Sequence, residues 1–182
     1  WILRCENQVL AVHGETPGKT FPLAEAGVFG SPDQALRVGQ WQGRPCYAAD
    51  VVTVPAGLDG ELTAVRALYG AAGAEAFALA GRATQLLDWK KNHRFCGRCA
   101  TPTVMRSTEF AMDCPSGGLL AYPRISPAVM VLVARGDELL LARSPHFRPG
   151  VFSALAGFVE AGETLEQCAV REVREAVGIE IA

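Results

Sequence analysis

Hydrophobic and polar residues form short runs through the first 80 residues. Gln8–Val12 and Ala35–Trp41 have the apolar and polar pattern of half-buried strands, and Gly and Pro residues separate such runs. Gln42-Gly43, directly after the second run, predicts a turn. Leu62–Leu68 and the alanine-rich stretch Ala71–Ala80 instead favour helix. The pattern therefore predicts strands, turns and helices in this half of the chain.

After residue 80 the pattern predicts a helix, then a β-hairpin and then a further strand. Residues 83–92 carry apolar positions at helical spacing and predict a helix. Residues 128–134 and 138–142 are apolar runs separated by Gly136-Asp137, and this pattern predicts a β-hairpin. Residues 151–156 predict a further short strand that leads into Gly157.

Residues 157–179 predict a loop between glycines, followed by a helix. Thr164 and Gln167 have the spacing of a capping box, and Gly178 suits the end of a helix about fourteen residues long. Glu172 and Glu175 share one face of that helix. Crowded carboxylates repel one another unless a cation joins them, and carboxylate oxygens suit Mg²⁺. A surface helix with Glu–Arg pairs is the alternative.

Composition and charge narrow the possible functions. With 49% hydrophobic and 20% charged residues in a chain of 182, we expect a buried core and little disorder. A net charge of −2 gives no global argument for nucleic acid, and no run of 18 apolar residues predicts a membrane span. The stretch from Arg82 to Arg106 is nevertheless basic, with six cations against Asp88. It predicts a solvated face or, alternatively, a phosphate-facing surface.

The cysteines indicate a metal site. Six cysteines are too sparse for a secreted disulfide scaffold, so we expect a reducing, cytoplasmic compartment. Cys96, Cys99 and Cys114 match three positions of a four-thiolate zinc ribbon, but Gly117 occupies the fourth. Zinc with an outside ligand or water, and a ribbon held by packing without zinc, are both open. His93 is a possible substitute ligand.

The 157–179 segment resembles the Nudix box, G-x5-E-x7-R-E-U-x-E-E-x-G-U, where U is a bulky aliphatic residue. Its second glutamate of the E-E pair, a principal metal ligand of the family, is replaced by Ala176. A substitution introduced to hold uncleaved substrate and a naturally weakened homologue both explain Ala176, and the intact surroundings favour the first. The matching positions are Gly157, Glu163, Arg171, Glu172, Val173, Glu175, Gly178 and Ile179.

The neighbourhood of the box resembles the NADH pyrophosphatase family of Nudix hydrolases. The C-x2-C ribbon and the runs 107–114, 122–127 and 154–160 carry this resemblance, which is close over residues 80–182 and loose before them. It implies an α/β protein in three parts. These are an N-terminal Nudix-like α+β domain over 1–80, a connecting helix and zinc-ribbon-like segment over 81–127, and the first part of a catalytic Nudix α/β/α sandwich over 128–182, which we expect to be incomplete.

The resemblance implies a metal-dependent enzyme. Members cleave the diphosphate of NAD(H) to nicotinamide mononucleotide and AMP and remove the NAD cap from RNA, and we expect a homodimer. Loss of the glutamate at position 176 implies an inactive or impaired form. A Nudix hydrolase for another nucleoside diphosphate such as ADP-ribose, and a catalytically dead module that binds a nucleotide or RNA, are the alternatives.

The resemblance also implies roles for single residues. For Mg²⁺ or Mn²⁺ it implies the carboxylates of Glu172 and Glu175, position 176 and the carbonyl of Ala156. Glu163 and Arg171 would brace the loop against the helix, with Gly157 in a structural role. For substrate it implies Phe158 stacked on the nicotinamide ring, Tyr122 and Glu109 across a dimer interface, and Arg66. Core packing is the alternative for Phe158 and for Tyr122.

Overall fold

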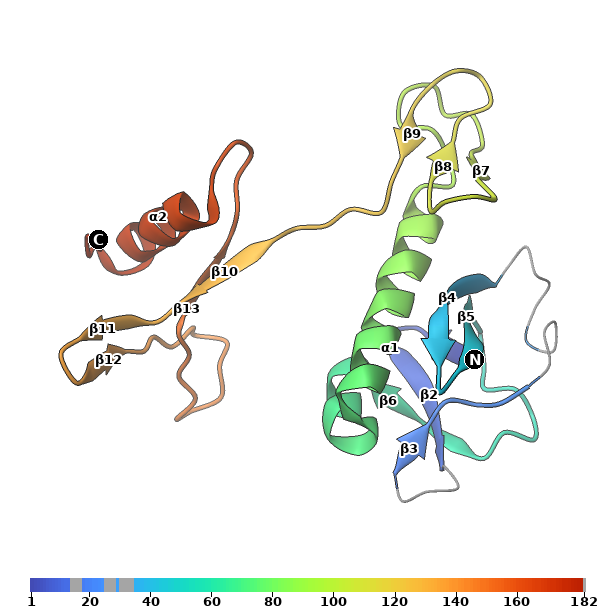
Figure 1. Ribbon diagram of the computed structural model, residues 1–182, viewed down its shortest axis with the longest axis horizontal. Coiled ribbons are helices and arrows are strands. Elements are labelled where there is room, and N and C mark those ends of the chain that lie inside the picture. The colour runs from blue at the N-terminus through green and yellow to red at the C-terminus, as the bar shows by residue number, and fades with distance from the viewer. Residues whose placement is uncertain (14–17, 25–28, 30–34, 182) are drawn as a thin grey trace. The chain divides into compact units, whose positions relative to one another are not determined.

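The computed structural model describes residues 1–13, 18–24, 29 and 35–181 (Figure 1). The chain divides into two compact units, Trp1–Pro123 and Arg124–Ala182, and each is described by itself. Both units combine strands with a helix. Neither helix of the described residues has the length and apolar character needed to cross a bilayer.

The first unit is built on a twisted sheet of six strands. Its order is β3-β2-β1-β5-β4, and β6 pairs with β2. The pair of β1 and β5 is parallel, whereas the other neighbours are antiparallel. The strands expected at residues 8–12 and 35–41 are confirmed as β2 and β4. The strands are β1 (Ile2–Cys5), β2 (Gln8–His13), β3 (Lys19–Thr20), β4 (Leu36–Trp41), β5 (Arg44–Asp50) and β6 (Gly60–Ala64).

A two-residue turn joins β4 to β5. Gln42 has φ of 50° and Gly43 has φ of 75°, so both central residues are left-handed, as a type I′ hairpin turn requires. Trp41 then lies opposite Arg44 across the hairpin. The turn predicted by Gln42-Gly43 thus fixes the register of this edge of the sheet.

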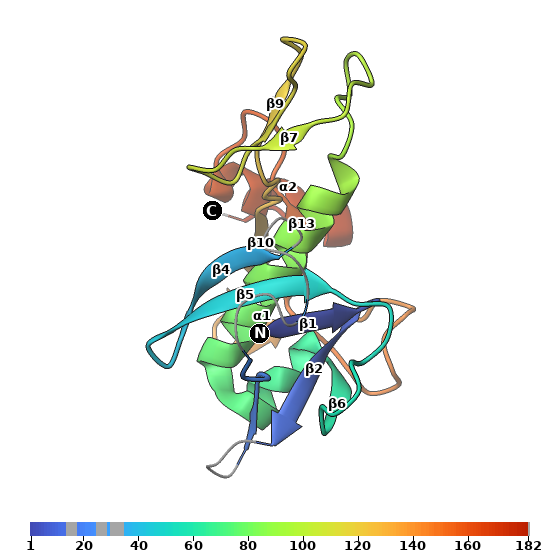
Figure 2. The same ribbon diagram turned by 90° about the vertical axis from the view of Figure 1, so that its right-hand side faces the viewer.

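One long helix covers a face of the sheet (Figure 2). The helix α1 (Leu68–Asn92) follows a 3₁₀ turn over Val65–Ala67, and it is kinked at Gly73. The helices expected over 71–80 and 83–92 are confirmed as one element. The helix expected over 62–68 is wrong for residues 62–64, which belong to β6 and gain backbone hydrogen bonds from β2. Residues 65–67 form the 3₁₀ turn, and Leu68 begins α1.

The sheet has an apolar core on each face. On the side of α1, the buried alanines of the helix let it lie close to the strands, where Ile2, Val9 and Leu36 are buried. The opposite face buries a smaller cluster that contains Trp1, Leu3 and Leu10. Successive side chains of a strand point to opposite faces of the sheet, so a single strand contributes residues to both cores.

A buried arginine ties the helix to the sheet. Arg4 is 4% exposed, and its guanidinium donates to both carboxylate oxygens of Asp50, at 2.6 and 3.0 Å. It also donates to Asp88 of α1 at 2.5 Å and to the Thr84 carbonyl at 3.3 Å. Because a buried charge is costly without partners, this cluster ties β1, β5 and α1 together.

We expect Asp50→Asn to lower the free energy of unfolding of this unit by about 2–3 kcal/mol, and Asp88→Asn by less, because Asp50 binds the buried guanidinium at two points. Asp59→Asn is the control, since Asp59 is exposed. Urea denaturation followed by tryptophan fluorescence measures this, as all three tryptophans lie in the first unit. Equal stability of the Asp50 and Asp59 variants would contradict the prediction.

A small three-stranded ribbon follows α1. It consists of β7 (Val104–Met105), β8 (Met112–Asp113) and β9 (Leu120–Ala121), paired in that order. Met112 is buried in the core beside α1, and Phe110 packs against that core. The ribbon is therefore an extension of the first unit.

The second unit places a helix beside a pair of strands. The strands β10 (Ala128–Val131) and β13 (Leu155–Phe158) are antiparallel, and β11 (Val133–Arg135) and β12 (Glu138–Leu140) form a hairpin. The helix α2 (Leu165–Val177) packs on β10 and β13. The predicted hairpin turn is confirmed. The strand expected over 151–156 lies later, because β10 pairs with residues 155–158.

Candidate active site and metal centres

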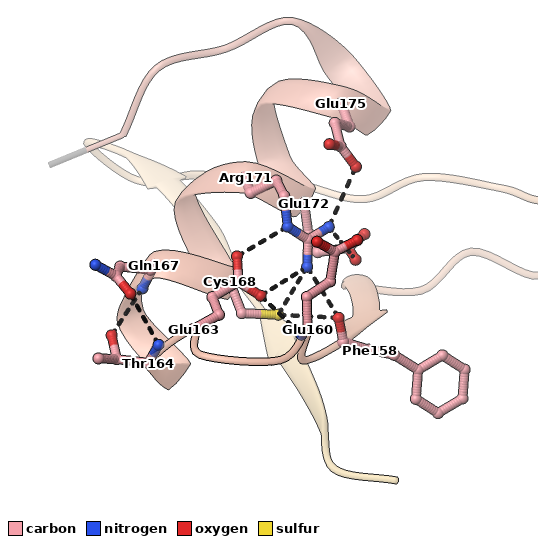
Figure 3. A network of polar contacts seen from close by, with 9 residues as sticks. All are labelled: Phe158, Glu160, Glu163, Thr164, Gln167, Cys168, Arg171, Glu172 and Glu175. Carbon is pink, nitrogen blue, oxygen red and sulfur yellow. Dashed lines mark hydrogen bonds and ion pairs between the residues drawn. The ribbon is translucent and has the colours of Figure 1, made fainter.

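The loop and helix of residues 157–178 begin and end as their sequence predicts. Gln167 N–H donates to Thr164 Oγ1 at 3.2 Å, and Thr164 N–H donates to Gln167 Oε1 at 2.9 Å, so the capping box is complete (Figure 3). Gly178 ends α2 in the left-handed conformation, with φ of 70°. These local signals fix where the acidic face of α2 points relative to the loop before it.

Arg171 connects the helix to the loop. Its Nε and Nη2 donate to the two carboxylate oxygens of Glu163 at 2.8 and 2.9 Å. The same Nη2 donates to the Phe158 carbonyl at 2.9 Å. Glu160 N–H donates to Glu163 at 3.0 Å. This arrangement is the brace expected for Glu163 and Arg171, and a fork-to-fork pair of this kind is geometrically specific.

The brace lowers the pKa of the Glu163 carboxyl to about 2, from an ordinary value of 4.5, through hydrogen bonds from Arg171 and from the Glu160 N–H. A lowered pKa in the folded state means that ionised Glu163 adds stability above pH 4.5, and that this contribution is lost as the pH falls through about 2. The loop should therefore keep its shape in moderate acid.

We expect the Glu163 carboxyl carbon to titrate near pH 2 in a ¹³C NMR experiment, and Arg171→Gln to move the midpoint up toward 4.5 because both donors are lost. Arg174→Gln is the matched control on the same helix, since Arg174 is exposed and makes no ion pair with Glu163. A midpoint near 4.5 in the unsubstituted chain would contradict the brace.

The two box carboxylates lie beside this brace. Arg171 Nη1 donates to Glu172 Oε1 at 2.9 Å and to Glu175 Oε2 at 3.2 Å. The Glu172 carboxylate lies directly against Gly157, where a Cβ atom would come within 1.7 Å of Glu172 Cδ. Gly157 therefore makes room for Glu172, which explains why this position of the box is glycine.

The donor set fits a divalent cation with hard oxygen ligands. Glu172 and Glu175 each use one oxygen toward Arg171, which leaves the other for a cation such as Mg²⁺ or Mn²⁺. Ala156 lies in β13 next to Gly157, so its backbone is adjacent to the Glu172 carboxylate. Ala176 is exposed and offers only a methyl group. The set therefore has one carboxylate fewer than the family pattern.

Cys168 is a site residue that sequence reasoning missed. Its side chain is fully buried, donates to the Phe158 carbonyl at 3.4 Å and accepts from Arg171 Nη2 at 3.5 Å. Burial raises the pKa of this thiol, so it stays protonated and keeps its donor. The sequence does contain a signal for this role, because Cys168 lies three residues before Arg171 and the two side chains therefore share one helix face.

The three ribbon cysteines come together as expected. The sulfurs of Cys96, Cys99 and Cys114 lie within 4.8 Å of one another, and those of Cys99 and Cys114 are 3.5 Å apart. Sulfurs around a tetrahedral zinc ion lie about 3.8 Å apart, since the Zn–S distance is about 2.3 Å. Among the described residues, these three are the one group of at least three metal-ligating side chains whose ligand atoms lie this close together.

The backbone around Cys96 suits a thiolate. Leu119 N–H and Arg98 N–H donate to Cys96 Sγ and lower the pKa of that thiol to about 6. Burial instead raises the pKa of Cys114. A Cβ atom on Gly118 would lie 2.7 Å from Cys96 Sγ, so only glycine, which has no side chain, fits at this position. At the fourth ligand position, Gly117 has open space around it.

The residues assigned to substrate lie in different places. Arg66 is exposed in the 3₁₀ turn before α1, whereas Glu109 and Tyr122 lie in the ribbon at the other end of that helix. Glu109 is paired with Arg106 at 2.9 Å. The first unit thus does not bring Arg66 to the other two.

The two aromatic side chains assigned to substrate are both exposed. Tyr122 is 52% exposed in the first unit, and Phe158 is 66% exposed in the second. The ring of Phe158 points away from the Arg171 network (Figure 3). Core packing within the described residues therefore accounts for neither ring.

Three family models together match almost the whole chain. Residues 1–89 match the NADH pyrophosphatase-like rudimentary NUDIX domain, residues 91–122 the NADH pyrophosphatase zinc ribbon domain, and residues 124–182 the NUDIX domain. This order confirms the expected fold class, with an N-terminal α+β domain, a ribbon and then the Nudix part.

Curated relatives agree with these models. The NAD-capped RNA hydrolase NudC of Pseudomonas aeruginosa (strain LESB58) is 44% identical over 183 residues, which is 100% of this chain and 57% of that protein. The proteins of the same name from Stutzerimonas stutzeri and Chromobacterium violaceum are each 49% identical over 79% of this chain, and over 52% and 54% of their own lengths. This chain thus spans a little over half the length of these relatives. It belongs to the NADH pyrophosphatase family of Nudix hydrolases.

Proposed function

We propose that the full-length protein hydrolyses the diphosphate of NAD(H) to nicotinamide mononucleotide and AMP, and removes the NAD cap from RNA. The observation that carries this proposal is the Glu172 carboxylate held between Gly157 and Arg171, with Glu175 on the same guanidinium. The relatives are named NAD-capped RNA hydrolases, and this supports the choice of substrate.

The proposed reaction needs a divalent cation, Mg²⁺ or Mn²⁺, held by Glu172, Glu175 and the Ala156 carbonyl. When bound, such an ion polarises phosphoryl oxygens and makes water a better nucleophile. The residues of this chain position the groups that take part. Arg171 orients both carboxylates, and the loop braced by Glu163 presents Phe158 on the outside. We propose that Phe158 stacks on the nicotinamide ring and that Tyr122, Glu109 and Arg66 contact substrate.

The alanine at position 176 determines the catalytic activity that we propose for this chain. Position 176 lies one helical turn after Glu172, on the face that carries the metal ligands. An exposed methyl group there supplies no ligand oxygen, so we propose that this chain is impaired in catalysis while its substrate contacts remain. A module that binds a nucleotide or RNA without cleaving it is the second candidate, and Ala176 is the observation that favours it.

The test compares substrates on the full-length protein carrying Ala176→Glu. We expect AMP release from NADH and nicotinamide mononucleotide release from NAD-capped RNA with Mg²⁺ or Mn²⁺, and slower cleavage of ADP-ribose. Glu172→Gln in that protein should abolish cleavage, whereas Glu166→Gln, an exposed acid in the first turn of α2, should not. Faster cleavage of ADP-ribose would replace the NAD(H) assignment, and no cleavage of any substrate would favour the binding module.

We also propose that the ribbon holds structural zinc through Cys96, Cys99 and Cys114. The fourth ligand would come from water or from outside the cysteine set, because Gly117 has no side chain. The convergence of three sulfurs and the N–H donors to Cys96 support a metal over a ribbon held by packing alone. His93 is a weaker candidate for that fourth ligand, since neither of its ring nitrogens belongs to the group of ligand atoms that the three sulfurs form.

Purified protein should contain about one zinc per chain after dialysis, measured by plasma mass spectrometry. Cys99→Ala should lose that zinc, because two thiolates and outside ligands hold the ion too weakly. Cys5→Ala is the matched control, as Cys5 is also a free, solvent-accessible thiol but lies outside the ribbon. Equal zinc content in the two variants would exclude this site.

Assembly and compartment complete the proposal. A homodimer follows from family membership, and it would let Tyr122 and Glu109 of one protomer reach the box of another. Sedimentation of the full-length protein at micromolar concentration tests it, and a monomer would remove that role for the two residues. The six free thiols support a reducing, cytoplasmic setting.

A further inference from the structure

A cleft in the first unit lies where the basic stretch of the sequence meets the ribbon. It has a volume of about 970 Å³ and is bounded by the second half of α1, the end of β5 and strand β7. Its lining includes apolar side chains, among them Leu87, Val104 and Met105. Four cations also line it: Lys90, Lys91, Arg94 and Arg106.

The negative charge of the cleft is already neutralised. Asp50 is the carboxylate among its lining residues, and both of its oxygens accept from Arg4. Arg106 is likewise paired, with Glu109 and Asp113. Lys91 and Arg94 are exposed, and neither forms an ion pair within the described part of the chain. Two cations are thus available to an anion.

The end of α1 accounts for the position of Lys91, which lies in the last turn of the helix, but not for that of Arg94. Basic residues often lie in the last turn of a helix because its carbonyls carry partial negative charge. Here the Trp89 carbonyl accepts from the His93 N–H at 3.1 Å and lies 2.7 Å from the His93 ring. Arg94 lies beyond the helix, with its guanidinium over the Phe95 ring at 5.8 Å.

We infer that this cleft binds single-stranded RNA, namely the nucleotides that follow the cap. Phosphates would contact Lys91 and Arg94, and bases would lie on the apolar side chains. Proteins hold single strands without reading their sequence in grooves that combine cations with side chains, chiefly aromatic ones, against which bases pack. Phe29 is the aromatic side chain in this lining. The inference rests on the proposed function, because it supplies the part of an RNA substrate that a free dinucleotide lacks.

Charge reversal at the two cations tests the cleft in the full-length protein. The probes are two fluorescein-labelled single-stranded RNAs of one sequence, one with a 5′ NAD cap and one without, followed by fluorescence anisotropy. We expect Lys91→Glu/Arg94→Glu to weaken binding of both RNAs by about tenfold or more. Arg37→Glu/Arg44→Glu is the matched control, because these exposed cations of β4 and β5 lie outside the cleft and change the net charge equally.

A milder pair of substitutions checks the mechanism. Lys91→Gln/Arg94→Gln should flatten the dependence of log K on log salt by about 1.4, since each phosphate contact on a single strand contributes about 0.7. Both side chains are exposed, so folding should be unchanged by circular dichroism. An unchanged salt dependence together with unchanged affinity would overturn the inference.

Hydrolysis of NADH separates this inference from the proposed function. In the Ala176→Glu background, the charge-reversed protein should cleave NADH at the control rate and cleave NAD-capped RNA more slowly. If RNA binding falls while NADH is not cleaved by any variant, the cleft stands and the hydrolase proposal fails. If NADH is cleaved and RNA binding equals that of the control pair, the cleft is not the RNA site.

Discussion

Ala176→Glu in the full-length protein is expected to raise the rate of AMP release from NADH by about 10³-fold or more. A metal-held transition state that loses an anionic ligand loses several kcal/mol, and each 1.36 kcal/mol is a factor of ten in rate. The change affects kcat more than KM, because the residues proposed to contact substrate, Phe158, Tyr122, Glu109 and Arg66, lie outside α2.

The matched control is Ala176→Gln, which adds a side chain of the same size without the negative charge. If the gain comes from a carboxylate ligand, glutamine should recover little of it. Equal gains from glutamate and glutamine would mean that position 176 acts by packing, and no gain from either would contradict the role proposed for this position. Metal titration with Mn²⁺ should show tighter binding for the glutamate variant alone.

Gly157→Ala is expected to produce the second large effect. The new methyl group would come within 1.7 Å of the Glu172 Cδ atom, so the carboxylate must leave its place beside the loop. In the Ala176→Glu background we expect a loss of about 10²-fold in NADH cleavage, because a shift of about 1 Å in a catalytic group costs that much. Overpacking should also cost about 1–3 kcal/mol of stability.

A double-mutant cycle identifies the clash. Glu172→Ala removes the group that the methyl would meet, so Gly157→Ala should cost less stability in that background than in the parent. Gly81→Ala is the control, since a Cβ atom at that position of α1 meets nothing within 4 Å. Equal costs of Gly157→Ala in both backgrounds would assign the effect to the backbone and not to Glu172.

The sequence alone predicted the parts of this protein that depend on local chemistry. The capping box of Thr164 and Gln167, the stop at Gly178 and the turn at Gln42-Gly43 are interactions among residues a few positions apart, and all three form as expected. The resemblance to the Nudix box implied that Glu163 and Arg171 pair, and their ion pair forms. The grouping of the ribbon cysteines followed from their spacing.

Tertiary structure decided the features that depend on residues distant in sequence. Residues 62–64 form a strand because β2 offers them backbone partners, although their composition favours helix. Strand β13 covers residues 155–158 because β10 sets its register. Long-range pairing outweighs local propensity here, since a buried backbone group must find a hydrogen-bond partner.

The same holds for the sites. Arg4 meets Asp88 across more than eighty residues, and the cleft beside Lys91 exists only because the ribbon folds back next to α1 and β5. The sequence identified Glu172 and Gly157 as box residues, but their contact arises where β13 and α2 pack together. Spacing along a chain predicts which groups share an element, whereas packing determines which elements bring their groups together.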